Sequence, residues 1–212
     1  MIKETKEPVI FTPDNEPYLG LSTLLAFDKS ISAIMEVNSI IAPSTHSIDP
    51  NKLQQAAIQI IPSSISLALS IRELIRQGYL YGAMVMLRPF IERVVTMQYL
   101  VRFTNKLDLW HQGWTYNKRP SLNKMINELW GDKFPDAPIA ITQSLNSLTH
   151  GDPQSASWNL VVSKAGSPAY AVSKITNKPD LCNSVALDAA TWLNILMVLM
   201  LDIFSDELNK NK

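Results

Sequence analysis

The spacing of apolar residues predicts four long α-helices. In each of four segments apolar residues recur three or four positions apart, which is the spacing of one helix face. These segments cover residues 21–41, 49–77, 78–105 and 180–208. Asp49 and Pro50 are typical of a helix start and Pro43 of a helix end, while Pro62 should bend or split the second helix. The link through Gly78 is short, which predicts an antiparallel pair of long helices.

Shorter elements lie between the third and the last of these segments. We expect short helices over residues 107–116, 121–130 and 136–150. Apolar and polar residues then alternate over 155–163 and again over 170–174, with a turn between them, which predicts a small β-hairpin. The predicted fold class is all-α, a helical bundle of four long helices with short inserted helices and a small β-hairpin before the last helix.

The chain divides into an N-terminal arm and one domain. Residues 1–18 contain Pro8, Pro13 and Pro17 and show no helical period, so we expect an extended arm. Residues 19–212 then form a single helical-bundle domain, which a length of 212 residues allows. The sequence has seven glycines, a low number that suits helices better than a turn-rich β fold.

Composition and charge narrow the classes of function. The formal net charge is zero, so no overall field attracts nucleic acid or an anionic membrane. Cys182 is the only cysteine and the three histidines are scattered, so we expect no intrachain disulfide, no metal site and no cofactor. The N-terminal residues lack the apolar core of a signal peptide, and the apolar run from Ile195 to Leu201 is too short to span a bilayer. We therefore expect a cytoplasmic protein without a membrane segment.

A polar stripe crosses the third predicted helix, which is otherwise apolar. Arg88 and Glu92 lie four positions apart near its middle, so they share one helix face. Tyr81 lies seven positions before Arg88, and Tyr99 lies seven positions after Glu92, so both extend the stripe. Pro89 removes one backbone hydrogen bond, at a cost of about 3 kcal/mol. Burying ions also costs free energy, so a charged pair in an apolar helix indicates a structural or functional role for that pair.

Two interpretations of this stripe are open. In the first, Arg88 and Glu92 form a buried ion pair that neutralises itself and holds neighbouring helices in register. In the second, the stripe is a pocket wall, where Arg88 anchors an anion and Glu92 orients the arginine. Pro89 favours neither interpretation, because a kink also serves simply to fit a helix to its neighbours.

His150 is a second candidate for chemistry. It ends the helix predicted over 136–150 and stands directly before Gly151 and Asp152, which stop that helix. The carbonyl end of the helix dipole favours a protonated imidazole, so one interpretation is a structural histidine that caps free carbonyls. The other is a general acid/base at the mouth of the bundle, with Asn146 one turn back on the same face.

Two short runs resemble known families. The run from Leu87 to Glu92, LRPFIE, resembles the L-R-P-x-x-E helix of an uncharacterised bacterial helical family, whose members also tend to have a His-Gly helix end downstream. The run from Asn146 to Gly151, NSLTHG, resembles the end of the R-N-x-x-x-H-G motif of HEPN domains. Leu145 stands where that motif has its arginine, so only Asn146, His150 and Gly151 match it.

The HEPN resemblance carries expectations about fold and activity. HEPN domains are helical bundles, often dimeric, and many are metal-independent ribonucleases of toxin–antitoxin and antiphage systems. The resemblance implies that the histidine assists attack by the 2′-hydroxyl and that the arginine steadies the phosphate, with both subunits of the dimer facing one cleft. In this chain Arg88 would have to supply the missing cation from a neighbouring helix.

The sequence therefore leaves two functions open. The first is a HEPN-like protein with a polar pocket, acting as a metal-independent ribonuclease-type effector in a defence or toxin context. Its expected catalytic residues are His150, Arg88 and Glu92, and its expected binding residues are Tyr81, Tyr99, Asn146 and Asp152. The expected partners are RNA and a second copy of the chain in a homodimer. The alternative is a non-catalytic helical module for dimerisation or partner binding, favoured by the absent motif arginine and the zero net charge.

Overall fold

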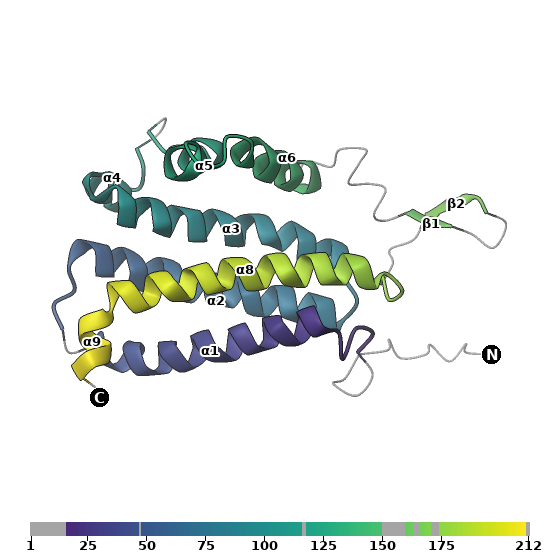
Figure 1. Ribbon diagram of the computed structural model, residues 1–212, viewed down its shortest axis with the longest axis horizontal. Coiled ribbons are helices and arrows are strands. Elements are labelled where there is room, and N and C mark those ends of the chain that lie inside the picture. The colour runs from purple at the N-terminus through teal and green to yellow at the C-terminus, as the bar shows by residue number, and fades with distance from the viewer. Residues whose placement is uncertain are drawn as a thin grey trace, which may run out of the picture.

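Four long helices form the body of the protein. The computed structural model describes residues 16–46, 48–115, 118–149, 160–162, 166–170 and 174–210. The long helices are α1 (Ser22–Ser44), α2 (Lys52–Arg76), α3 (Leu80–Arg102) and α8 (Pro179–Ile203). α2 packs against α3, α1 packs against α8, and α8 also contacts α2 and α3, as Figure 1 shows. The predicted all-α bundle of four long helices is confirmed.

Short elements join α3 to α8 and follow α8. The described ones are η1 (Thr104–Lys106), α4 (Leu107–His111), α5 (Leu122–Trp130), α6 (Ala137–Thr149), β1 (Leu160–Val162), β2 (Pro168–Tyr170) and α9 (Ser205–Lys210). α5 and α6 pack against each other, and both pack against α3. In Figure 1 they lie on the side of α3 that faces away from α1. We call α5 and α6 the outer layer.

The ends of α2 explain where the helical hairpin starts and turns. The Asn51 side chain accepts a hydrogen bond from the backbone N–H of Gln54 at 2.9 Å, and Gln54 Oε1 accepts one from the Asn51 N–H at 3.1 Å. This capping box begins the helix at Asn51, two residues after the predicted cap at Asp49. At the other end Gly78 has a φ of +78°, and a Cβ there would lie 3.3 Å from Thr176 Cγ2. Glycine is therefore required at the turn between α2 and α3.

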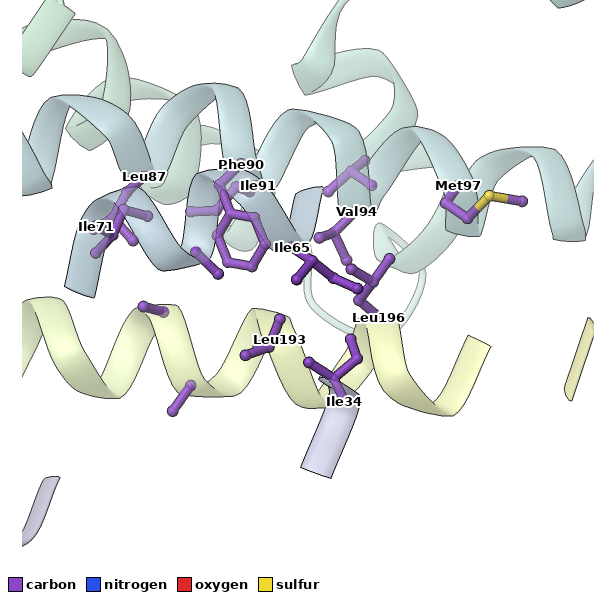
Figure 2. Packing of buried hydrophobic residues seen from close by; sticks show 14 of the residues in the cluster. Ile34, Ile65, Ile71, Leu87, Phe90, Ile91, Val94, Met97, Leu193 and Leu196 are labelled. Carbon is purple, nitrogen blue, oxygen red and sulfur yellow. The ribbon is translucent and has the colours of Figure 1, made fainter. Parts of the chain in front are cut away.

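The core lies between the four long helices. Phe27 of α1, Phe90 of α3 and Leu193 of α8 are fully buried, and Figure 2 shows Phe90 and Leu193 at the contact between α3 and α8. Pro62 lies inside α2 and Pro89 inside α3, and both helices continue past their proline. α1 also contains Pro43, which was expected to end it, and extends one residue further to Ser44. A proline interrupts only its own backbone hydrogen bond, and burial of large side chains such as Phe90 offsets that loss.

Three predicted elements differ in the structure. The helix expected over 107–116 ends at His111, and the one expected over 180–208 is divided at Phe204 into α8 and α9. β1 pairs antiparallel with β2 over three residues on each strand. The longer hairpin expected between 155 and 174 is not supported, because the described pairing goes no further and most of the remaining segment lies outside the described residues.

Two helices bear on the question of a membrane. α2 and α8 are both long and apolar enough to cross a bilayer by length and composition. The prediction considered only the run from Ile195 to Leu201, which is part of the longer helix α8. Core helices of soluble bundles meet the same criterion, and both helices bury one side in the core. The absence of a membrane segment and the cytoplasmic location stay predictions.

The N-terminal arm is described only at its end. Residues 1–15 lie outside the described residues, so the division into an arm and a domain stays a prediction. Tyr18 is 3% exposed and its hydroxyl donates to the carbonyl of Ile175 at 2.5 Å. The end of the expected arm is thus attached to the segment that leads into α8.

Candidate functional site

Arg88 reaches from α3 to the outer layer. Its Nη1 donates a hydrogen bond to Asn146 Oδ1 and lies 3.4 Å from Thr149 Oγ1. Asn146 and Thr149 are three positions apart on α6, so they face the same way. Both partners are neutral. The positive charge of Arg88 is therefore not neutralised by these contacts.

Glu92, one turn further along α3, pairs with a different arginine. Its carboxylate accepts a hydrogen bond from Arg119 Nη2, and the side chains of Glu92 and Arg119 are 27% and 56% exposed. The structure thus joins Glu92 to Arg119 in place of the Arg88–Glu92 pair that one interpretation of the stripe expected. Exposed salt bridges contribute only about 0–1 kcal/mol, so this contact orients the two side chains more than it stabilises the fold.

The two tyrosines of the stripe lie in different surroundings. Tyr99 is 2% exposed, and its hydroxyl donates to Glu128 Oε2 of α5 at 2.6 Å. Burial, helped by the hydrogen bond to Glu128 and the negative charge there, raises the pKa of Tyr99 to about 12. Tyr81 is half-buried. Tyr99 therefore attaches α5 to α3 from within the fold.

The described residues of the stripe connect α3 to the outer layer and to the segment that leads into it. Arg88 contacts α6, Glu92 contacts the segment before α5, and Tyr99 contacts α5. His150 and Asp152, the remaining predicted site residues, lie outside the described residues. In the sequence His150 follows the last residue of α6, four positions after Asn146.

A cleft of about 430 Å³ opens beside Glu92. Its lining side chains come from α2, α3, α4 and the segments around residues 114 and 119, and they are Ile60, Glu92, Arg93, Thr96, Trp110, Trp114 and Arg119. We call it the tryptophan cleft. Arg93 Nη1 donates to the carbonyl of Pro89 at 3.0 Å, and the Thr96 hydroxyl donates to the carbonyl of Glu92 at 2.7 Å. The cleft combines two guanidinium groups and two indole rings with one carboxylate.

The end of α4 places Trp114 in this cleft. The N–H of Gly113 donates to the carbonyl of Trp110 at 2.9 Å, and the N–H of Trp114 donates to the carbonyl of Leu109 at 3.0 Å. These two bonds form a Schellman motif, which needs a left-handed residue after the helix. Gly113 has a φ of +79° and Trp114 a φ of +48°. The early end of α4, relative to the prediction, follows from Gly113.

An ionic cluster of one arginine and two carboxylates, of which that of Glu16 is buried, lies at the end of the bundle where α2 finishes. Arg72 Nη2 donates to Glu16 Oε1 at 2.9 Å and to Asp28 Oδ2 at 3.1 Å, and the Glu16 side chain is 2% exposed. Burial alone lowers the pKa of Arg72, but the hydrogen bonds and charges of Asp28 and Glu16 outweigh it, so the pKa is raised. This cluster ties the N-terminal segment and α1 to α2. We assign it a structural role.

The described residues offer little for metal binding or for nucleophilic catalysis by a cysteine. Among the residues that the structure describes, no group of three or more His, Cys, Asp or Glu side chains is arranged to bind a metal. Cys182 is fully buried, and burial raises the pKa of its thiol to about 12. A thiol with such a pKa is protonated at neutral pH and is a poor nucleophile.

Several residues of the site were not predicted from the sequence. Arg119 lies in a loop, whose course the helical period does not describe. Trp110 lies in α4 and Trp114 just beyond its end, within the stretch that was predicted as one continuous helix. Gly113 could have indicated where Trp114 lies, since a glycine two residues past a short helix is typical of a Schellman motif that ends the helix. Thr149 could have been found from Asn146, because residues three apart on a helix share a face.

Comparison with known proteins yields one family match. The family of unknown function DUF5677 matches residues 54–118. No curated protein and no solved structure matches the chain. The matched residues include the run from Leu87 to Glu92, which is consistent with the resemblance to an uncharacterised family. They end before Asn146, so the match does not extend to the part of the chain that resembles HEPN domains.

Proposed function

We propose that the protein is a HEPN-like effector that cleaves RNA without a metal ion in a defence or toxin context. The observation that carries the proposal is the hydrogen bond from Arg88 to Asn146. Leu145, at the position of the HEPN arginine, is 5% exposed and apolar, so that position supplies no cation. Arg88 extends from α3 and places its guanidinium against Asn146, the residue that follows Leu145. It is therefore suited to the role of the missing arginine.

The charge of Arg88 supports this role. An arginine that only holds two helices together is usually paired with a carboxylate, as Arg72 is with Glu16 and Asp28. The partners of Arg88 are an amide and a hydroxyl, and a guanidinium has five N–H donors. Arg88 therefore keeps both charge and hydrogen-bond capacity for a phosphate, with which arginine forms bidentate contacts.

The proposed reaction is transesterification within the RNA chain. His150 takes the proton of a 2′-hydroxyl, whose oxygen attacks the adjacent phosphorus and forms a new P–O bond. The bond from phosphorus to the 5′-oxygen of the next nucleotide breaks, and that oxygen takes a proton from water. The hydroxide that remains takes the proton that His150 had accepted, which restores the neutral imidazole. The products are a 2′,3′-cyclic phosphate and a free 5′-hydroxyl. Arg88 stabilises the negative charge on the phosphate oxygens, a kind of contribution that is typically worth 10²–10³ in rate.

The other predicted residues have supporting parts. Glu92, one helix turn from Arg88, holds Arg119 through their ion pair, and Asn146 positions Arg88. Tyr81 and Asp152 are proposed to contact the bound RNA, and Tyr99 to hold α5 in place through Glu128. A homodimer would bring two such sites together, as in the family that the chain resembles, and RNA of the cytoplasm is the proposed substrate.

The test is RNA cleavage by the purified protein in a metal chelator. The wild-type protein should cleave single-stranded RNA into products with 2′,3′-cyclic phosphate ends, and His150→Ala should lose this activity. Arg76→Ala, which removes a charge at the end of α2, is the matched control and should cleave like the wild type. Wild-type protein that leaves RNA intact, or His150→Ala with full activity, would rule out the proposed reaction.

A second function is favoured by the outward side of α8. Five exposed residues of this helix follow each other at alternating spacings of four and three: Leu187, Thr191, Asn194, Val198 and Leu201. Leu187 is 57% and Val198 62% exposed. Such spacing is typical of a helix–helix seam, where one asparagine sets the register. This supports the alternative that the protein is a non-catalytic module that dimerises or binds a helical partner through α8.

The oligomeric state in solution tests this alternative. If the seam forms a dimer, the wild-type protein should sediment as a dimer and Val198→Asp as a monomer. Ile58→Asp, which changes an exposed apolar residue of α2, is the control and should leave the dimer intact. A monomeric wild-type protein would argue against self-association through α8.

A further inference from the structure

We propose that the tryptophan cleft is a nucleotide-binding site, where the indoles of Trp110 and Trp114 contact a base and the guanidinium of Arg93 binds its phosphate. Arg88 and Asn146 do not line the cleft, and the cleavage step proposed for His150 and Arg88 uses none of the lining residues, although Glu92 of the polar stripe is one of them. The inference rests on the proposed function only in naming RNA as one source of the nucleotide.

Arg93 is the main argument for an anionic ligand. Among the described residues its side chain donates to one acceptor, the carbonyl of Pro89 at 3.0 Å, which leaves most of its N–H groups for a ligand. Arg119, also in the lining, is bonded to Glu92, and its side chain is 56% exposed. The lining therefore has one more positive than negative charge. A phosphate suits this arrangement, because it accepts several hydrogen bonds from guanidinium groups.

The two indoles specify a ligand with a flat ring. Trp110 and Trp114 are half-buried and pack partly against the core, so both rings are held in place while part of each lines the cleft. Stacking of a base on an aromatic side chain is worth about 1–3 kcal/mol and accepts any base. Inorganic phosphate has no ring that could stack on the indoles. The pairing of indoles with guanidinium groups therefore favours a nucleotide.

The local backbone supports a site that is formed before the ligand binds. Trp114 has a φ of +48°, a left-handed conformation that a bulky side chain rarely adopts, and it directly follows Gly113, the left-handed residue of the Schellman motif. Residues held in such conformations are concentrated at ligand sites, where the surrounding structure compensates the strain. The volume of about 430 Å³ lies within the range of small-molecule sites.

Binding of two defined probes tests the inference. The probes are adenosine 5′-monophosphate and a short single-stranded oligoadenylate RNA, added to full-length His150→Ala protein so that cleavage cannot consume the RNA. Tryptophan fluorescence and titration calorimetry report binding. We expect quenching of tryptophan fluorescence by at least one probe, and at least about tenfold weaker binding after Arg93→Ala, since a charge-assisted hydrogen bond is lost. Arg76→Ala in the same background is the control and should bind like the parent.

The pattern of binding by the two probes shows whether the site exists and which form of nucleotide it takes. Binding of both probes, or of the monophosphate alone, supports the site with a free nucleotide as a sufficient ligand, and binding of the RNA alone supports it with a chain as the source. Should Arg93→Ala not fold, Arg119→Ala takes its place, because Arg119 lies in an exposed segment. No binding of either probe, or unchanged affinity in both variants, overturns the inference. Probe binding by a wild-type protein that leaves RNA intact would contradict the cleavage proposal and leave the nucleotide site standing.

Discussion

The guanidinium of Arg88 on α3 is hydrogen-bonded to the side-chain oxygen of Asn146 on α6, although 58 positions separate them in the sequence. Each residue belongs to a run that resembles a different family, LRPFIE for Arg88 and NSLTHG for Asn146. Packing of the outer layer on α3 brings the two runs together. The contact therefore connects the helix matched by the family of unknown function with α6, the helix that His150 follows in the sequence.

The first prediction concerns the strength of this contact. Arg88→Ala and Asn146→Ala should each lower the free energy of unfolding, and a double-mutant cycle should give a coupling energy of about 0.5–1 kcal/mol, since the contact is partly exposed. Urea unfolding followed by circular dichroism measures it. A parallel cycle between Arg76→Ala and Asn146→Ala should be additive, because these side chains are not in contact. Additive effects in the Arg88 cycle would mean that the two residues are not coupled.

The second prediction concerns Tyr99 at high pH. Its pKa is raised from 10.0 to about 12, mainly by burial and also by Glu128. The folded state therefore holds the phenol proton more tightly than the unfolded state. This contribution to stability is fully present below pH 10 and is lost as the pH rises toward about 12.

Tyrosinate absorbance during a pH titration measures this effect. Tyr99→Phe should remove the part of the titration that occurs near pH 12. Tyr79→Phe changes a tyrosine that is 41% exposed, and should leave that late part in place. An unchanged late titration in Tyr99→Phe would mean that Tyr99 is not the source of it.

The third prediction compares the same substitution at two glycines. Gly113→Ala should lower stability by about 1–2 kcal/mol, because alanine disfavours the φ of +79° found there, and should shift the fluorescence of Trp114. Gly82→Ala in α3 should raise stability by about 0.5–1 kcal/mol, since its Cβ would meet Leu74 methyl groups at ordinary contact distances of 3.5 and 3.6 Å. Equal effects at both positions would contradict the Schellman geometry.

The four long helices could be predicted because their signal is local. Apolar residues repeated over twenty or more positions leave little choice of structure. The short helix expected over 121–130 is α5, where the Ser121 side chain accepts a hydrogen bond from the Lys124 N–H at 3.2 Å. Helix ends were harder. Asp49 and Asn51 are both good caps, and the chain uses Asn51 because Gln54 completes a capping box.

The partners of the polar residues could not be predicted in the same way. Glu92 and Arg88 are close in sequence, yet Glu92 pairs with Arg119 and Arg88 with Asn146. Which side chain meets which depends on how the outer layer lies on α3, and no local pattern encodes that. Arg72 joins Glu16 and Asp28 in an ionic cluster, and both carboxylates come from segments distant in sequence, so no local pattern indicates the cluster.

The most direct test of the central claim is the single-turnover rate of RNA cleavage by Arg88→Ala in a metal chelator. The account predicts a rate at least about 10² below that of the wild-type protein, because the charge that stabilises the phosphate is removed while the bundle core is untouched. Circular dichroism and thermal unfolding should confirm that the variant is folded. A folded Arg88→Ala protein that cleaves RNA as fast as the wild type would contradict the account.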